Sequence, residues 1–141
     1  RWMPDYVREL GVDLTKHPSV DMREYIYDMP AVMAAADLII CRAGAATISE
    51  VAASGTPCIM VPSPNVTDNH QEKNARVLEA HGAAVVVRES ECDGDVLYET
   101  AKSILSDPAR RREMTQAAHR MAVVDAAERI YQTAMELAKA R

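Results

Sequence analysis

Four short runs of apolar and β-branched residues recur along the first two thirds of the chain. They cover residues 23–27, 38–41, 58–61 and 84–87. The last three runs are apolar throughout, and the first becomes so after Arg23 and Glu24. Short apolar runs that do not alternate with polar residues are the pattern of strands buried on both faces. We therefore expect four short, buried strands.

Segments with helical spacing lie between these runs. A short alanine-rich segment covers residues 30–36, and longer helices are predicted at 45–54 and about 69–81. Gly55 and Gly82 follow the two longer segments, at the position where glycine commonly ends a helix. The alternation of strand and helix predicts an α/β fold, with a Rossmann-like parallel sheet and helices on both of its faces.

After the fourth run the pattern is wholly helical. Asp107 and Pro108 have the order of an N-cap followed by a proline in the first helical position, and Asp125 could cap a last helix. We expect one domain over residues 1–141, with a helical segment from about 93 to 141. The first residues look like the tail of a helix that Gly11 ends, which indicates a fragment. The sheet is also expected to be incomplete at the N-terminus.

Composition and charge narrow the function. Apolar residues make up 48% of the 141 residues, and the net charge of -5 argues against a nucleic-acid-binding surface. The basic cluster at residues 110–112 is predicted to be a solvated helix face. Cys41, Cys58 and Cys92 lie far apart and predict neither a disulfide nor a zinc site, which suits a reducing cytoplasm. No apolar stretch approaches the roughly 20 residues that a membrane-spanning helix needs.

The turn after the second run is the first candidate site. It contains Gly44 and several small residues, and a helix begins directly after it. Small residues let a ligand approach the backbone, and the free N–H groups of a helix start favour a phosphate. Glu50 could accept hydrogen bonds from a ribose diol. Two structural explanations stay open: Thr47 and Glu50 have the spacing of a capping box, and Gly44 could serve only a tight turn.

The loop after the third run, residues 62–74, is the second candidate site. It is polar and rich in proline, and it follows the carboxyl end of a predicted strand, where α/β sheets bind ligands. His70, Gln71 and neighbouring amides could bind sugar hydroxyls. Alternatively the loop is a surface turn that leads into a helix capped by Asp68 or Asn69.

No catalytic centre can be assembled from the sequence. His17, His81 and His119 have no nucleophile or metal-ligand partner at a telling spacing. We therefore assign no catalytic residue and no metal ligand to this chain, and we expect no cofactor.

The residues of both candidate sites resemble the MurG family of glycosyltransferases. The resemblance is carried by the segments 25–29, 36–45, 47–50 and 62–75, and it extends over roughly residues 5–138. It implies the C-terminal, UDP-sugar-binding half of a two-domain GT-B transferase. It also implies inverting, metal-independent transfer of N-acetylglucosamine from its UDP donor to undecaprenyl-diphosphoryl-N-acetylmuramoyl-pentapeptide.

The resemblance implies a role for each position of the site. The backbone of Ile26 would contact the uracil, Glu50 the ribose, and Gln71 the sugar hydroxyls, while His70 stands where many relatives have glutamine. The first turn of the helix would contact the diphosphate. The predicted substrate-binding residues are therefore Ile26, Arg42, Gly44, Ala45, Ala46, Thr47, Glu50, His70 and Gln71.

Several parts of the family pattern are missing from this sequence. The glycine-rich G-G-S-x-G loop is absent, and so is the N-terminal domain that would supply the acceptor site, the membrane contact and the general base. The resemblance places the whole enzyme at the cytoplasmic face of the cell membrane. We expect this chain alone to be inactive. Two alternatives are a donor-binding subunit that needs a separate membrane-bound partner, and a related UDP-sugar glycolipid transferase.

Overall fold

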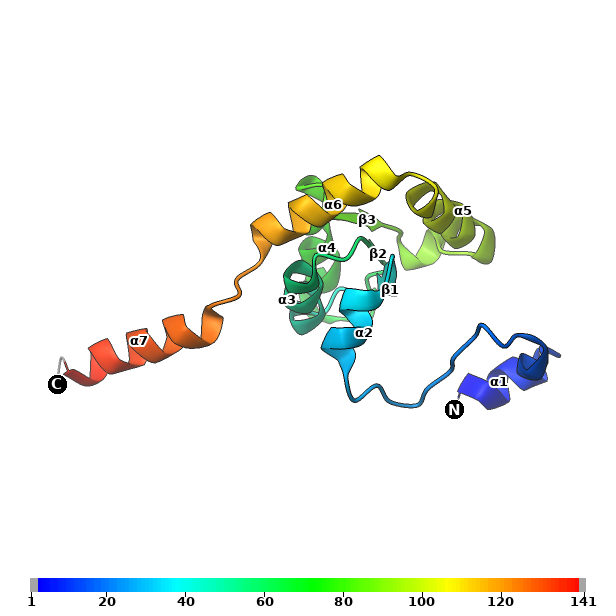
Figure 1. Ribbon diagram of the computed structural model, residues 1–141, viewed down its shortest axis with the longest axis horizontal. Coiled ribbons are helices and arrows are strands. Elements are labelled where there is room, and N and C mark those ends of the chain that lie inside the picture. Colours follow the sequence, from blue (N-terminus) through cyan, green and yellow to red (C-terminus); the bar gives the residue numbers. More distant parts are fainter. Residues whose placement is uncertain (1–2, 140–141) are drawn as a thin grey trace.

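The computed structural model describes residues 3–139 and contains a parallel three-stranded sheet (Figure 1). The strands are β1 (Ile39–Cys41), β2 (Cys58–Met60) and β3 (Ala84–Val86), in the spatial order β1-β2-β3. Ile40, Ile59 and Val85 occupy the same level of the sheet. The last three predicted strands are thus confirmed. Their predicted burial is correct for the middle strand β2, whose three residues are all buried, and wrong for β1, where Ile40 is exposed at the edge of the sheet.

Seven helices surround or extend from this sheet in the described part of the chain. In chain order they are α1 (Met3–Glu9), α2 (Met29–Ala35), α3 (Ala45–Ser54), α4 (His70–Ala80), α5 (Gly94–Leu105), α6 (Pro108–Met121) and α7 (Ala126–Lys139). Single 3-10 turns lie at Leu14–Lys16, Thr67–Asn69 and Glu89–Glu91. None of these helices is long and apolar enough to cross a membrane.

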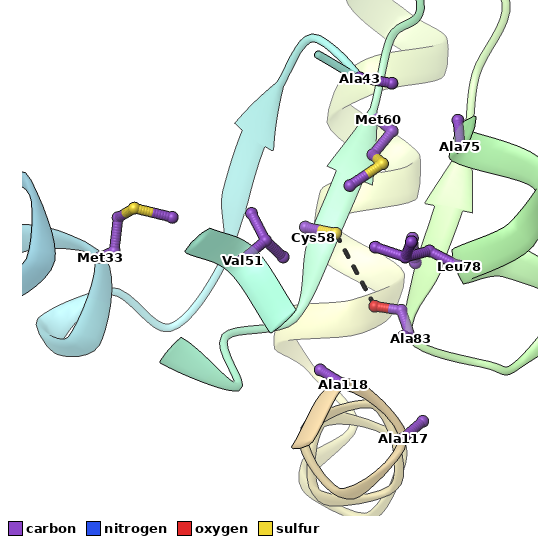
Figure 2. Packing of buried hydrophobic residues seen from close by; sticks show 11 residues of the cluster. Met33, Ala43, Val51, Cys58, Met60, Ala75, Leu78, Ala83, Ala117 and Ala118 are labelled. Carbon is purple, nitrogen blue, oxygen red and sulfur yellow. Dashed lines mark hydrogen bonds between the residues drawn. The ribbon is translucent and has the colours of Figure 1, made fainter. Parts of the chain in front are cut away.

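The two faces of the sheet pack against different helices. On one face, Cys58 and Met60 contact Val51 of α3 and Leu78 of α4 (Figure 2). On the other face, Ile59 packs with Ile104 of α5 and with α6. Because side chains alternate along a strand, β2 supplies buried residues to both clusters. The predicted fold class, a parallel sheet with helices on both faces, is confirmed.

The helix ends follow the local chemistry of the sequence. Asp107 accepts hydrogen bonds from the amides of Ala109 and Arg110, both at 3.0 Å, and Pro108 occupies the first helical position as predicted. Gly55 closes α3 in the left-handed conformation, with φ of 70°. A β-carbon added to Gly55 would lie only 2.2 Å from Nε2 of the His119 imidazole, which is too close for any real contact. Glycine is therefore required here by both conformation and space.

Two predictions about the fold are wrong. Residues 23–27 do not form a strand: Tyr25 and Tyr27 are exposed, and their rings contact each other edge to face at 4.8 Å. A strand needs a neighbour for its backbone hydrogen bonds, and the described sheet offers this segment none. The basic cluster on α6 is not wholly solvated, because Arg111 is half-buried and donates to Asp37 at 2.8 Å.

The first and last helices stand away from the sheet. α1 is joined to α2 by a long irregular segment, and α7 projects from the end of α6 (Figure 1). No residue of α7 is buried, although Ile130, Tyr131 and Leu137 give it an apolar face. The compact part of the molecule therefore consists of the sheet with α2 to α6.

Candidate functional site

The loops that follow the three strands meet at the carboxyl edge of the sheet. Arg42 lies directly after β1, and its Nη1 atom donates to the backbone oxygen of Val61 at 3.1 Å, just after β2. The same nitrogen donates to the carboxylate of Glu89, which follows β3. One side chain thus joins all three strand ends, at the edge where such sheets bind ligands.

The start of α3 offers free hydrogen-bond donors at this edge. Its first internal bond runs from the amide of Ile48 to the oxygen of Gly44, at 3.0 Å. Within residues 3–139, no acceptor is present for the amides of Ala45, Ala46 and Thr47. Ala45 and Ala46 are exposed. An anion placed here would receive these donors and the positive end of the helix dipole.

The two structural explanations for this turn are wrong. Thr47 is the third residue of α3 and not its N-cap, so it forms no capping box with Glu50. Gly44 has φ of -67° and ψ of 148°, an extended conformation that any residue adopts. A β-carbon on Gly44 would contact only the Thr47 hydroxyl, at an ordinary 3.7 Å. The fold therefore requires neither the glycine nor the carboxylate.

Glu50 borders a small apolar groove between α2 and α3. The groove has a volume of about 280 Å³ and is lined by Met29, Pro30, Met33 and Ala34 from α2, and by Glu50, Ala53 and Ser54 from α3. The Glu50 side chain is exposed, and no described residue bonds to its carboxylate. A free acceptor beside an apolar groove suits a ligand with hydroxyl groups next to a flat apolar part.

The loop after β2 presents two polar side chains at the start of α4. The Nδ1 atom of His70 lies 2.9 Å from the backbone oxygen of Thr67. A carbonyl only accepts hydrogen bonds, so Nδ1 is the donor in this contact, and Nε2 remains available for a ligand hydroxyl. The Oε1 atom of Gln71 accepts from the amide of Ser63 at 3.0 Å, which leaves its NH₂ group as a donor.

The expected capping of α4 is not formed. Asn69 lies at the N-cap position, but its side chain makes no capping bond and donates instead to Glu72 at 2.8 Å. Asp68 pairs with Lys73 at 2.7 Å. Both Asp68 and Asn69 have positive φ, at 56° and 49°. Two consecutive left-handed residues turn the chain sharply just before His70, which brings the start of α4 to the edge of the sheet.

One predicted site residue, Ile26, is not among the residues that the structure brings together at the carboxyl edge of the sheet. Three polar residues at that edge were not predicted to belong to the site. Ile26 is half-buried, three residues before α2, and lines none of the described hollows. Glu72, Arg88 and Glu89 line a hollow of about 320 Å³ beside the loop after β2. Because Arg88 and Glu89 follow the last apolar run, the rule that singled out the first two strand ends applies equally to the third.

Cys41 and Cys58 are packing groups and not nucleophiles. Burial raises the pKa of Cys41 to about 11 and that of Cys58 to about 12, so both thiols stay protonated near neutral pH. The sulfur of Cys58 lies 3.7 Å from the backbone oxygen of Ala83 (Figure 2). Among residues 3–139, no three metal-ligating side chains are grouped closely enough to hold a metal ion.

Fold and site together define a class of protein. A parallel sheet with a free helix start and polar loops at its carboxyl edge is typical of Rossmann-like domains, which bind ligands at that edge. The sequence model described as the glycosyltransferase family 28 C-terminal domain matches residues 5–130. The chain belongs to this family.

Comparisons with individual proteins agree with this family. The chain is 46% identical over 124 residues to the UDP-N-acetylglucosamine--N-acetylmuramyl-(pentapeptide) pyrophosphoryl-undecaprenol N-acetylglucosamine transferase of Acetivibrio thermocellus, covering 88% of this chain and 34% of the relative. It is 47% identical to the enzyme of the same name from Salinibacter ruber, over 133 residues, 94% of this chain and 36% of that relative. The chain thus spans about a third of the length of these relatives.

A solved structure gives the same picture in three dimensions. The crystal structure of Acinetobacter baumannii MurG matches with a TM-score of 0.75 and 34% sequence identity, over 82% of this chain and 33% of that one. The predicted resemblance to the MurG family is confirmed. The matched residues 5–130 include the sheet and the loops after β1 and β2 in which the candidate site residues lie.

Proposed function

We propose that this chain is the donor-binding part of an inverting glycosyltransferase. The enzyme would move N-acetylglucosamine from UDP-N-acetylglucosamine to undecaprenyl-diphosphoryl-N-acetylmuramoyl-pentapeptide, a step of peptidoglycan synthesis. Family membership and the names of the relatives support this assignment. One observation in the structure carries it: three unpaired helix-start amides lie one turn away from the unpaired Glu50.

The chemistry of the site suits each part of a nucleotide sugar. The amides of Ala45, Ala46 and Thr47, with Gly44 before them, would hold the diphosphate. Glu50 would accept hydrogen bonds from the ribose hydroxyls, with the base directed toward the α2–α3 groove and the backbone of Ile26. His70 and Gln71 would contact the sugar, one as acceptor and the other as donor.

The proposed reaction is a direct displacement at the anomeric carbon. The acceptor hydroxyl attacks from the face opposite UDP and loses its proton to a base that this chain does not supply. The bond from the anomeric carbon to the diphosphate oxygen breaks, and negative charge grows on that diphosphate. The start of α3 stabilises this charge without moving, which is the arrangement that electrostatic catalysis needs.

The remaining functions would lie beyond this chain. We propose that the acceptor site, the general base and the membrane contact belong to a further domain, at the cytoplasmic face of the cell membrane. The donor is a substrate, and no cofactor is proposed.

Titration calorimetry with UDP-N-acetylglucosamine tests this proposal. Thr47→Asp would place a carboxylate among the amides that should meet the diphosphate, so we expect donor affinity to fall at least roughly tenfold. Glu99→Gln, on the exposed surface of α5, changes the net charge by one unit far from the site and is the control. Equal affinities for Thr47→Asp and the unmodified chain would refute the site. Tighter binding of UDP-glucose or UDP-galactose would favour the glycolipid transferase.

A second candidate function, a donor-binding subunit that works beside a separate membrane-bound partner, is favoured by α7. Ile130 and Leu137 on this helix are 70% and 67% exposed, and a single surface helix rarely displays such a face without a partner. Sedimentation of the chain with and without the membrane fraction of its source tests this candidate. Co-sedimentation that Leu137→Asp abolishes would support it, and co-sedimentation unchanged by Leu137→Asp would oppose it.

A further inference from the structure

Arg42 is occupied within the protein and does not project as a free cation. Its Nη1 atom bonds both to the backbone oxygen of Val61 and to the carboxylate of Glu89. The side chains of Arg42 and Glu89 are 53% and 41% exposed, so the pair lies at the surface of the carboxyl edge. The neighbouring carboxylate offsets the charge that Arg42 would otherwise offer to a diphosphate.

Further hydrogen bonds link this region to the start of α4, where His70 and Gln71 lie. Arg88, next to Glu89, donates from Nε to Glu72 of α4 at 3.0 Å. Gln71, next to Glu72, accepts from the amide of Ser63 at 3.0 Å. Two ion pairs, joined through the adjacent backbone residues 88 and 89, therefore connect the residue after β1 to the loop after β3 and that loop to the start of α4.

We propose that Arg42 and Glu89 form a positioning pair that fixes the start of α3 relative to the loop carrying His70 and Gln71. The pair would thereby set how tightly a nucleotide-sugar donor binds without either residue contacting the donor. This inference rests on the proposed function. It assigns Arg42 an indirect role, in contrast to the direct substrate contact predicted from the sequence.

The pair affects binding more than folding for a physical reason. Exposed ion pairs contribute little to stability, because solvent and salt screen them. A donor that contacts two loops at once, however, requires both to be in place, and every loop arrangement that misplaces one contact lowers its affinity. Loss of the pair should weaken donor binding while leaving the thermal midpoint of unfolding nearly unchanged.

A double-mutant cycle on donor affinity tests the inference. UDP-N-acetylglucosamine is titrated calorimetrically into the unmodified chain, Arg42→Met, Glu89→Gln and the double variant, and each thermal midpoint is recorded. Glu99→Gln is the control, because it removes one negative charge from the exposed Lys102–Glu99 pair of α5. We expect each single variant to bind roughly fivefold more weakly, and the double variant to bind no worse than either. The control should bind normally.

The outcomes distinguish failure of the positioning pair from failure of donor binding itself. Normal affinity of Glu89→Gln, with donor binding by the unmodified chain intact, would overturn the positioning pair and leave the proposed function standing. Weak binding by Arg42→Met but not by Glu89→Gln would show that Arg42 contacts the donor directly, which also overturns the pair. Absence of donor binding by the unmodified chain would remove the proposed function, and the inference with it.

Discussion

The middle strand and the loops at its carboxyl end are held in place by different forces. Every residue of β2 is buried, and Ile59 and Met60 are completely covered by neighbouring helices. At the same edge of the sheet, Arg42 after β1 pairs with Glu89 after β3, and Arg88 pairs with Glu72 of α4, in exposed or half-buried ion pairs. Within a few residues along the chain, the buried apolar packing of β2 gives way to polar contacts that are exposed to water.

This difference indicates how substitutions should act in the two regions. Packing in the sheet is dense, so a lost methyl group there leaves a cavity and lowers the free energy of unfolding. The polar contacts of the loops are individually weak, so their loss should change what the molecule binds and leave its folding nearly intact. The effects of substitution are therefore expected to be largest in β2 and smallest among the exposed polar contacts.

The largest effect is expected in the middle strand. Ile59→Ala removes a fully buried side chain between the sheet and α5, and should lower the free energy of unfolding by about 3 kcal/mol. The matched control is Ile130→Ala on α7, where the side chain is 70% exposed and the change should be below about 0.5 kcal/mol. Urea unfolding measures both. Similar losses for the two variants would show that burial does not distinguish the regions.

Gly55 tests packing at the end of α3. Gly55→Ala forces a β-carbon into left-handed backbone and against His119, and should destabilise the chain by about 2–3 kcal/mol. Gly82 has a similar φ of 76° with open space around it, so Gly82→Ala should cost only about 1–2 kcal/mol. Adding His119→Ala to Gly55→Ala should bring the loss down to the level of Gly82→Ala. A double variant as unstable as Gly55→Ala alone would exclude the contact with His119 as the cause.

Glu50, in the first two turns of α3, tests whether a substitution at the carboxyl edge of the sheet changes binding without changing stability. Glu50→Ala removes the proposed ribose acceptor and should weaken UDP binding roughly tenfold. Its thermal midpoint should stay unchanged, because no described residue bonds to the carboxylate. Calorimetric titration with UDP, with Glu99→Ala as control, measures the effect. A lowered thermal midpoint without loss of affinity would return Glu50 to a structural role.

The smallest effect is expected at Glu72. Hydrogen bonds from Asn69 and then Arg88 hold the pKa of Glu72 below its ordinary value. A lowered folded-state pKa stabilises the protein above the unfolded pKa, and this stabilisation is lost as the pH falls through the folded value. Glu72→Gln should therefore melt slightly below the unmodified chain at pH 7, and the difference should disappear at the acidic end of a melting series. A difference that is the same at every pH would contradict this account.

The sequence predicted the buried part of the molecule well. Apolar runs located β1, β2 and β3, and the bounds of α3 agree with the predicted helix at 45–54. The expected burial on both faces holds for β2 but not for β1, where Ile40 is exposed. The strand prediction failed at residues 23–27, where β-branched and aromatic residues lie without a neighbouring strand. Strand formation depends on a partner that a local pattern does not reveal.

The residues at the carboxyl edge of the sheet were predicted less completely than the strands. Gly44, Glu50, His70 and Gln71 follow the first two strand ends and were found from the pattern and the family resemblance. The contact between Arg42 and Glu89 joins residues 47 positions apart. Local spacing carries no information on such a pair. The capping-box spacing of Thr47 and Glu50 was misleading for a different reason: α3 begins two residues before Thr47, with Gly44 as its N-cap.

Donor binding at the carboxyl edge of the sheet is the central claim, and amide NMR shifts during titration with UDP-N-acetylglucosamine test it most directly. The account predicts saturable shifts concentrated at residues 44–50 and 70–71, with Ile26 also affected and the helices α5 and α7 unchanged. A well-dispersed spectrum that shows no shifts at millimolar donor, or shifts located away from the strand ends, would contradict it.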